Sequence, residues 1–114
     1  MTAAYPDPQL SRDKAIGHTR SVLTEVFDER LAQVDTHNRS QNLDDAYIDG
    51  ELAKAAGAYA LNAAGQASGS LFWPWPWAQW KPKDARRDLI RSAALAVAEV
   101  ERIDRAAALA GAQS

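Results

Sequence analysis

The sequence predicts an all-α protein with three principal helices and an aromatic Pro/Trp loop before the last of them. Apolar residues recur at helical spacing in three stretches, and alanine is common in the second and third. The tryptophans, with three of the five prolines, gather between those two stretches. At 114 residues the chain has the length of one domain. We expect a flexible N-terminal segment over 1–10, a single helical domain over 11–110 and a C-terminal tail over 111–114.

Composition excludes several kinds of protein. The chain has no cysteine, so it can form neither a disulfide framework nor a thiolate metal site. Its net charge of −2 and pI near 5.6 argue against an extended nucleic-acid-binding surface. Neither a signal peptide nor an apolar run of membrane-spanning length is present, so we expect a cytoplasmic protein that does not engage a membrane.

The first helix is expected to begin after Ser11, which can cap it, and to end near Val34. Residues at helical spacing share one face, namely Ile16, Thr19, Leu23, Val26, Phe27, Arg30 and Val34. Arg30 is the exception on this apolar face, about 20° from the line of Leu23. Its alkyl stem can pack while the guanidinium reaches water, whereas a fully buried arginine needs a partner.

Residues 35–48 are polar and rich in turn formers, which predicts a connection to the second helix. Asp49 is the expected N-cap of that helix, and Gly65 is the expected residue just after its end. Its apolar face comprises Leu52, Ala56, Tyr59 and Ala63. Because alanine buries little area, a lone chain would be thinly stabilised. We therefore expect a homo-oligomeric helical bundle, joined through the Ala-rich faces or the tryptophan loop.

All four tryptophans lie in the loop W-P-W-P-W-A-Q-W, residues 73–80. The alternating prolines stiffen this loop towards polyproline geometry. Exposed indoles would promote aggregation, so the bundle itself, a neighbouring subunit or a planar ligand should cover them. The third helix is expected to start near Pro82 or Asp84 and to run to about Leu109, with Gly111 beyond its end.

Basic residues lead from the tryptophan loop into the third helix, where free N–H groups and the helix dipole favour a phosphate. Indoles can stack on a nucleobase. Asp84 and Asp88 offset part of this positive charge, and Asp84 can cap the helix. The candidate ligand-binding residues are Arg30, Trp73, Trp75, Trp77, Trp80, Lys81, Lys83, Arg86, Arg87 and Asp104. Arg86 is the leading candidate among them, because it faces the apolar seam of its helix.

Four segments together resemble a family of small, mostly uncharacterised phage and prophage proteins. They are D-E-R-L-A-Q-V (28–34), D-G-E-L-A-K-A-A-G-A-Y-A (49–60), W-P-W-P-W-A-Q-W-K-P-K-D-A-R-R-D-L-I (73–90) and A-E-V-E-R-I-D-R (98–105). More distantly the chain is similar to the MazG-like all-α nucleoside triphosphate pyrophosphatases. That likeness implies magnesium held by acidic motifs on two helices. Glu101 and Asp104 match the E-x-x-D motif of the later helix. On the earlier helix the likeness implies several glutamates at positions i, i+3 and i+4, but this chain has Glu51 at the first of them and Lys54 and Ala55 at the other two.

Three interpretations stay open. The first is a protein that binds a phosphorylated ligand, of nucleotide type, without turnover and without a cofactor. By analogy with small phage proteins, the ligand could be a host immune signalling nucleotide, sequestered intact in the host cytoplasm as an anti-defence device. The second is a magnesium-dependent pyrophosphatase whose metal ligands are Glu51, Glu101 and Asp104. The third is a structural or protein-interaction module.

Overall fold

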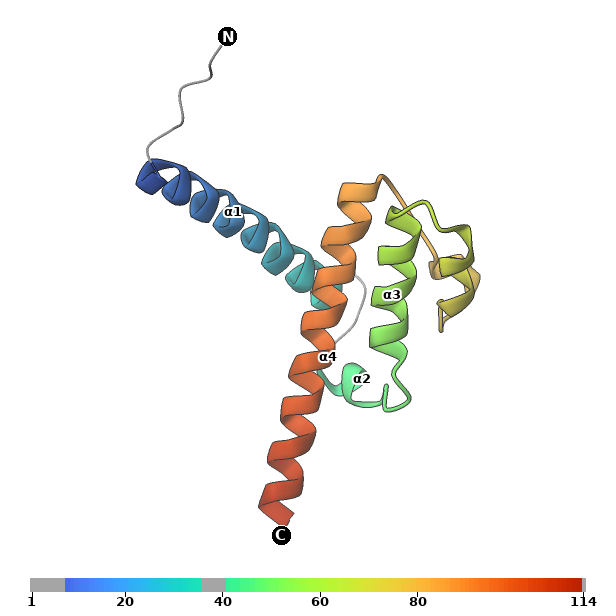
Figure 1. Ribbon diagram of the computed structural model, residues 1–114. Helices are drawn as coiled ribbons and strands as arrows, with labels where there is room; N and C mark the ends of the chain where they lie inside the picture. The colour runs from blue at the N-terminus through green and yellow to red at the C-terminus, as the bar shows by residue number, and fades with distance from the viewer. Residues whose placement is uncertain (1–7, 36–40, 114) are drawn as a thin grey trace.

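The computed structural model describes residues 8–35 and 41–113, and throughout these residues the chain is helical or irregular, with no strand (Figure 1). The three long helices are α1 (Pro8–Asp35), α3 (Glu51–Ala63) and α4 (Ala85–Gln113). A short helix, α2 (Gln41–Asp45), precedes α3, and two 3₁₀ helices, η1 (Ala67–Phe72) and η2 (Trp77–Gln79), lie in the loop before α4. The predicted all-α class is confirmed.

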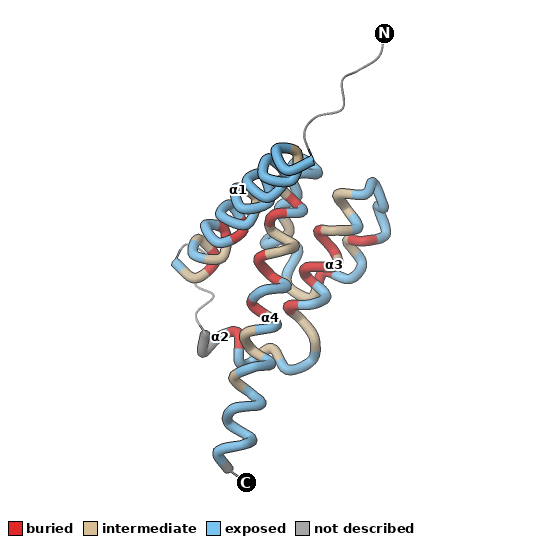
Figure 2. Tube along the Cα trace, turned by 60° about the vertical axis from the view of Figure 1, so that its left-hand side comes forward, coloured by how far each residue is buried: buried red, intermediate tan, exposed pale blue. Residues whose placement is uncertain are grey.

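Helix α4 lies in the middle of the fold and carries a core on each side (Figures 1 and 2). Towards α3 the buried residues are Leu52, Ala55, Ala56, Ala58, Tyr59, Trp73, Leu95 and Ala98. Towards α1 the core is smaller and consists of Val26, Ile90 and Ala94. Alanines at the contact let α3 and α4 approach closely. The Ala-rich faces that we expected to join subunits are therefore used within one chain.

Helix α3 ends where the sequence predicts, just before Gly65. This residue has φ 78°, a left-handed conformation that glycine adopts without a Cβ clash. Its N–H donates to the Asn62 carbonyl at 3.0 Å, and the Gln66 N–H donates to the Leu61 carbonyl at 2.9 Å. These two hydrogen bonds form a Schellman motif, which satisfies carbonyls that the helix end would leave unpaired.

The start of α3 differs from the prediction. The N-cap is Gly50, with φ 79° and no side-chain capping hydrogen bond, and not Asp49. The Glu51 carboxylate instead accepts a hydrogen bond from the Asp49 backbone N–H at 2.7 Å. Glu51 thus reaches back over the helix start and holds the turn that leads into α3.

Three further boundaries differ from those expected. Helix α1 begins at Pro8, because proline fits the first helical position, so residues 8–10 are helical and 1–7 lie outside the described residues. The predicted connection contains α2, while 36–40 are also outside the described part. Helix α4 continues through Gly111 to Gln113, since the surrounding alanines favour helix strongly enough to carry one glycine. Residues 111–113 are therefore helical, not a tail.

The apolar face predicted for α1 is largely exposed (Figure 2). Leu23 and Phe27 keep 60% and 62% of their surface accessible, whereas Glu29 and Gln33 are buried. Helix α1 meets α4 through Val26, Glu29 and Gln33, and the rest of its length projects from the body of the fold (Figure 1). No helix in the described residues is both long and apolar enough to cross a membrane.

Candidate ligand-binding site

Three of the four tryptophans pack against the chain's own aromatic residues. Tyr59 of α3 is the centre: its ring stacks on Trp80 with centroids 4.8 Å apart and meets Trp73 edge-on at 5.4 Å. Trp73 in turn contacts Trp75 at 5.2 Å, and Trp75 contacts Tyr47 at 5.1 Å. This aromatic cluster holds the tryptophan loop against α3.

The fourth tryptophan lies outside that cluster. Trp77, at the start of η2, is 60% exposed. The Trp73 indole N–H donates to the Pro76 carbonyl at 3.2 Å, which fixes the turn before η2. The loop is therefore rigidly held and presents one indole to the outside.

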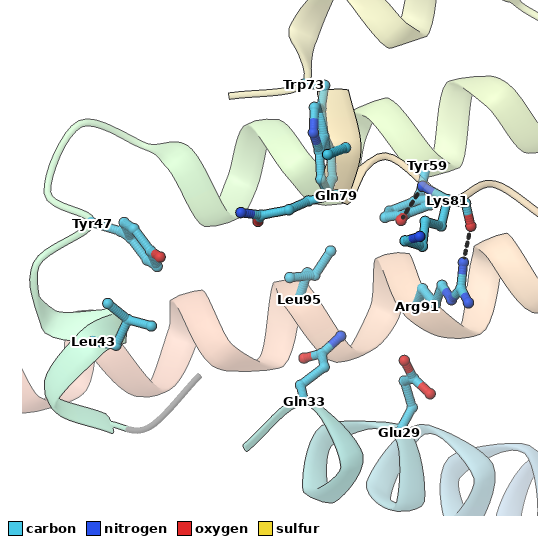
Figure 3. Close-up of a pocket in the computed structure, with 11 residues that line it drawn as sticks. Glu29, Gln33, Leu43, Tyr47, Tyr59, Trp73, Gln79, Lys81, Arg91 and Leu95 are labelled. Carbon is cyan, nitrogen blue, oxygen red and sulfur yellow. Dashed lines mark hydrogen bonds between the residues drawn. The ribbon is translucent and has the colours of Figure 1, made fainter. Parts of the chain in front are cut away.

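A pocket of about 350 Å³ lies between the end of α1, the aromatic cluster and α4 (Figure 3). It is lined by Glu29 and Gln33 of α1, Leu43 and Tyr47 around α2, Tyr59 of α3, Trp73, Ala78, Gln79 and Lys81 of the loop, and Arg91 and Leu95 of α4. This volume is at the small end of the range for ligand pockets in proteins. Aromatic walls with a few polar groups are typical of sites for planar organic ligands.

The basic end of the pocket is built from Lys81 and Arg91. The Arg91 guanidinium lies 5.6 Å from the centre of the Tyr59 ring and donates to the Lys81 carbonyl. The Lys81 backbone N–H donates to the Tyr59 hydroxyl at 3.5 Å. Figure 3 shows Tyr59, Lys81 and Arg91 grouped at this end, with Gln33 and Glu29 facing them from α1.

Gln33 is the unusual member of the pocket. Its side chain is only 4% exposed, yet its Oε1 atom has no hydrogen-bond partner. In Figure 3 the amide points away from α1 towards Leu95 and the pocket interior. A buried amide oxygen without a partner costs free energy, so native proteins rarely contain one unless a ligand or water satisfies it.

The basic residues at the start of α4 are engaged in ion pairs with α1. The Nη1 and Nη2 atoms of Arg86 donate to the Glu25 carboxylate at 2.9 and 2.5 Å, and the hydrogen bond and charge of Arg86 lower the pKa of Glu25 below its ordinary value. Arg87 pairs with the buried Glu29 at 2.5 Å. Neither Arg86 nor Arg87 lines the pocket. These ion pairs fasten α1 to the start of α4.

The N-terminus of α4 is capped by its own carboxylates. The Asp84 carboxylate accepts from the Arg87 N–H at 2.9 Å, and this backbone hydrogen bond is the main cause that lowers the Asp84 pKa. The buried Asp88 carboxylate accepts from the Lys83 N–H at 2.7 Å and from the Asn62 amide at 3.0 Å. The positive end of the helix that we expected to hold phosphate thus already faces two acidic groups.

Arg30 lies away from the pocket in a largely buried ion-pair network. Its guanidinium binds Asp44 of α2 at 2.8 Å and Glu101 of α4 at 2.9 Å. The Asp44 side chain is fully buried and the Arg30 side chain is 11% exposed. Arg30 therefore ties α1 to α2 and α4 instead of reaching solvent.

The carboxylates considered for magnesium do not converge. Among the described residues, no group of three or more His, Cys, Asp or Glu side chains is placed to hold a metal ion. Glu101 is bound to Arg30, Glu51 holds the turn before α3, and Asp104 is exposed.

Of the ten predicted ligand-binding residues, only Trp73 and Lys81 line the pocket. Four other residues of the pocket were not predicted, namely Gln33, Tyr47, Gln79 and Arg91. A signal for Gln33 was present, because Val22, Val26, Glu29 and Gln33 share a helix face and two of these four are polar. No local signal separates Arg91 from the other arginines of α4.

Comparisons of the chain with protein-family models, curated proteins and solved structures find no match. The fold and pocket define a small all-helical protein with an aromatic-walled cavity.

Proposed function

We propose that the protein binds a phosphorylated ligand of nucleotide type in the pocket beside Gln33, and that it does so without turnover. The planar part of the ligand would lie along Tyr47, Tyr59 and Trp73, and the phosphate would lie at the Lys81 and Arg91 end. Stacking on aromatic side chains is worth on the order of 1–3 kcal/mol per base. Arginine and lysine supply charge-assisted hydrogen bonds to phosphate oxygens.

The observation that carries this proposal is the Gln33 amide. Its Oε1 is buried and without a partner, and the amide offers both donors and an acceptor. A nucleobase presents the complementary N–H and carbonyl edge, and side-chain amides bind such edges in pairs. The ligand would thus satisfy the Gln33 Oε1 atom, which lacks a hydrogen-bond partner among the described residues.

The absence of turnover in this proposal is supported by the carboxylates. Pyrophosphate hydrolysis needs a metal ion to bind phosphate oxygens and to activate water. Among the described residues that line the pocket, the acidic one is Glu29, and its carboxylate is paired with Arg87. The pyrophosphatase reading is therefore the weaker one. The idea that the ligand is a host signalling nucleotide rests on the resemblance to phage proteins alone.

Calorimetry with purified protein and a panel of mononucleotides and cyclic dinucleotides tests the proposal. We expect at least one to bind, and we expect Gln33→Met and Arg91→Met each to weaken binding by at least about tenfold. Arg102→Met is the matched control, since Arg102 lies outside the pocket and pairs with Glu99 of the same helix, and it should bind as the parent does. Mass spectrometry of small molecules retained by the purified protein would identify a ligand that the panel omits.

Three results would contradict the proposal. One is the absence of any bound nucleotide in both experiments, which would favour a structural or protein-interaction module. Another is equal binding by Gln33→Met, Arg91→Met and the parent, which would place the site elsewhere. The third is hydrolysis of the bound nucleotide when magnesium is added, which chromatography of the products would detect.

A further inference from the structure

Helix α1 carries an apolar stripe that no residue of 8–35 or 41–113 covers. Ile16, Leu23, Phe27 and Leu31 recur at helical spacing and are 42%, 60%, 62% and 46% exposed. A shallow groove along this face is lined by Ala15, Ile16, Thr19, Arg20, Leu23, Thr24 and Phe27. Of residues 8–21, all but Ser11 are exposed. The first half of α1 therefore lacks tertiary packing.

The dimensions of the molecule indicate missing contacts. Its radius of gyration is 17.8 Å, whereas a compact domain of this length has about 13 Å. Its accessible surface is 7851 Å², against about 6,100 Å² for a compact protein of 12.4 kDa. The excess is about 1,700 Å², which is about twice the area of about 800 Å² per partner that a standard protein interface covers.

The exposed charges of α1 are divided along its length. The first half carries Arg12, Lys14 and Arg20 against one acid, Asp13. In the second half Asp28 and Asp35 are exposed and acidic, and the third exposed acid, Glu25, is already paired with Arg86 of α4. A helix with one basic and one acidic half complements an identical helix that runs in the opposite direction, whereas a parallel pair would place like charges together.

We propose that a second copy of this chain covers the stripe, so that two α1 helices pack antiparallel about a two-fold axis near Leu23 and Thr24. In this arrangement Ile16 of one copy lies opposite Leu31 of the other, and Arg20 lies beside Asp28. A two-fold axis repeats each of these contacts, as an isologous interface requires. The pairing buries the stripe of both copies and gives the projecting half of α1 its tertiary packing.

Analytical ultracentrifugation at tens of micromolar chain tests the pairing. We expect a dimer for the parent and a monomer for the double variant Leu23→Asp, Phe27→Asp, whose dissociation constant should rise by at least about a hundredfold. Both residues are exposed in the single chain, so the variant should keep the helical circular dichroism of α3 and α4 and lose at most the contribution of the first half of α1. The matched control Val100→Asp, Ile103→Asp changes the exposed face of α4 and should remain dimeric. A monomeric parent would overturn the proposal, as would a dimer that only the α4 variant dissociates.

The relative direction of the two α1 helices is tested by cross-linking variants that each carry a single cysteine, since the native chain has none. Thr24→Cys lies near the proposed axis and should form a covalent dimer with a short bismaleimide. Arg12→Cys should not, because an antiparallel pair separates the two copies of residue 12 by about 34 Å along the helix. Efficient cross-linking of Arg12→Cys to itself would show a parallel pair and overturn the arrangement.

Discussion

Arg30 shows how one residue can organise a small helical protein. It sits on the side of α1 that meets α4 and binds the fully buried Asp44 as well as Glu101. A buried carboxylate requires a partner, so the position of α2 depends on this arginine. Through these two ion pairs Arg30 links α1 to α2 and to α4.

Replacing Arg30 by methionine should destabilise the fold by about 3–5 kcal/mol, because Asp44 would stay buried without its guanidinium. Urea denaturation followed by circular dichroism measures this loss. The control is Arg105→Met, which breaks the more exposed pair with Asp45 on the same short helix and should cost at most about 1 kcal/mol. Similar losses of stability for the two variants would show that the burial of Asp44 does not determine how much the Arg30 ion pair contributes to the free energy of unfolding.

The sequence could identify Arg30 as unusual but not explain it. An arginine on an apolar stripe is visible from helical spacing alone. Its partner Asp44 lies in a polar segment that predicts only a connection, and Glu101 is 71 residues away. The same limit applies to Gln33, since only the way in which α1, the aromatic cluster and α4 surround it makes its position a pocket.

At the scale of elements, the start of α4 is governed by Asp84. Its carboxylate accepts from the Arg87 N–H, and its pKa is lowered chiefly by that hydrogen bond. A carboxyl whose pKa is lower when folded stabilises the fold above its unfolded pKa and stops doing so as the pH falls through its folded pKa.

Asp84→Asn keeps a capping acceptor that does not titrate. We expect the variant to be less stable than the parent at neutral pH and the difference to disappear as the pH falls below about 4. Thermal unfolding of both proteins across this pH range measures it, and the comparison cancels the titration of other carboxyls. A difference that is the same at pH 7 and at pH 3 would contradict this assignment.

Helix η1 depends on a close approach at Gly69. A Cβ on this residue would lie 2.5 Å from the Leu61 Cβ and 3.2 Å from the Ala58 carbonyl oxygen. Gly69→Ala should therefore destabilise the fold by about 1–3 kcal/mol. Gly57→Ala, in the interior of α3 with open space around its Cβ, should stabilise it by about 0.5–1 kcal/mol. Chemical denaturation of both variants measures these changes in the free energy of unfolding. A Gly69→Ala variant as stable as the parent would show that η1 can move away from α3.

Local signals predicted the end of α3 and the cap of α4, but they did not predict the starts of α1 and α3, the end of α4 or the face that α1 buries. Gly65 and Asp84 act through their own neighbours, so their roles could be predicted from the sequence. The face that α1 buries is chosen by α4, which follows about fifty residues later in the chain. There the ion pairs of Arg86 and Arg87 with Glu25 and Glu29 select the polar side of α1 and leave the apolar side outward.

At the scale of the whole molecule, α4 holds two small cores instead of one. Alanine fills much of the larger core, and only three buried residues form the core beside α1. Thin cores of this kind are usually supplemented by assembly or by ligands. The proposed α1 interface and the pocket beside Gln33 would supply both kinds of contact at different ends of α1.

The first half of α1 provides the last test of this arrangement. A free helix of about fourteen residues is only marginally stable in water, so residues 12–21 should fray in a monomer. In the dimer their amides should exchange with solvent at least about tenfold more slowly than in the monomeric variant Leu23→Asp, Phe27→Asp. Hydrogen exchange followed by mass spectrometry measures this, with the amides of Leu52, Ala55 and Ala58 in the buried core as an internal control that should not change. Equal protection of residues 12–21 in both proteins would show that this half-helix needs no partner.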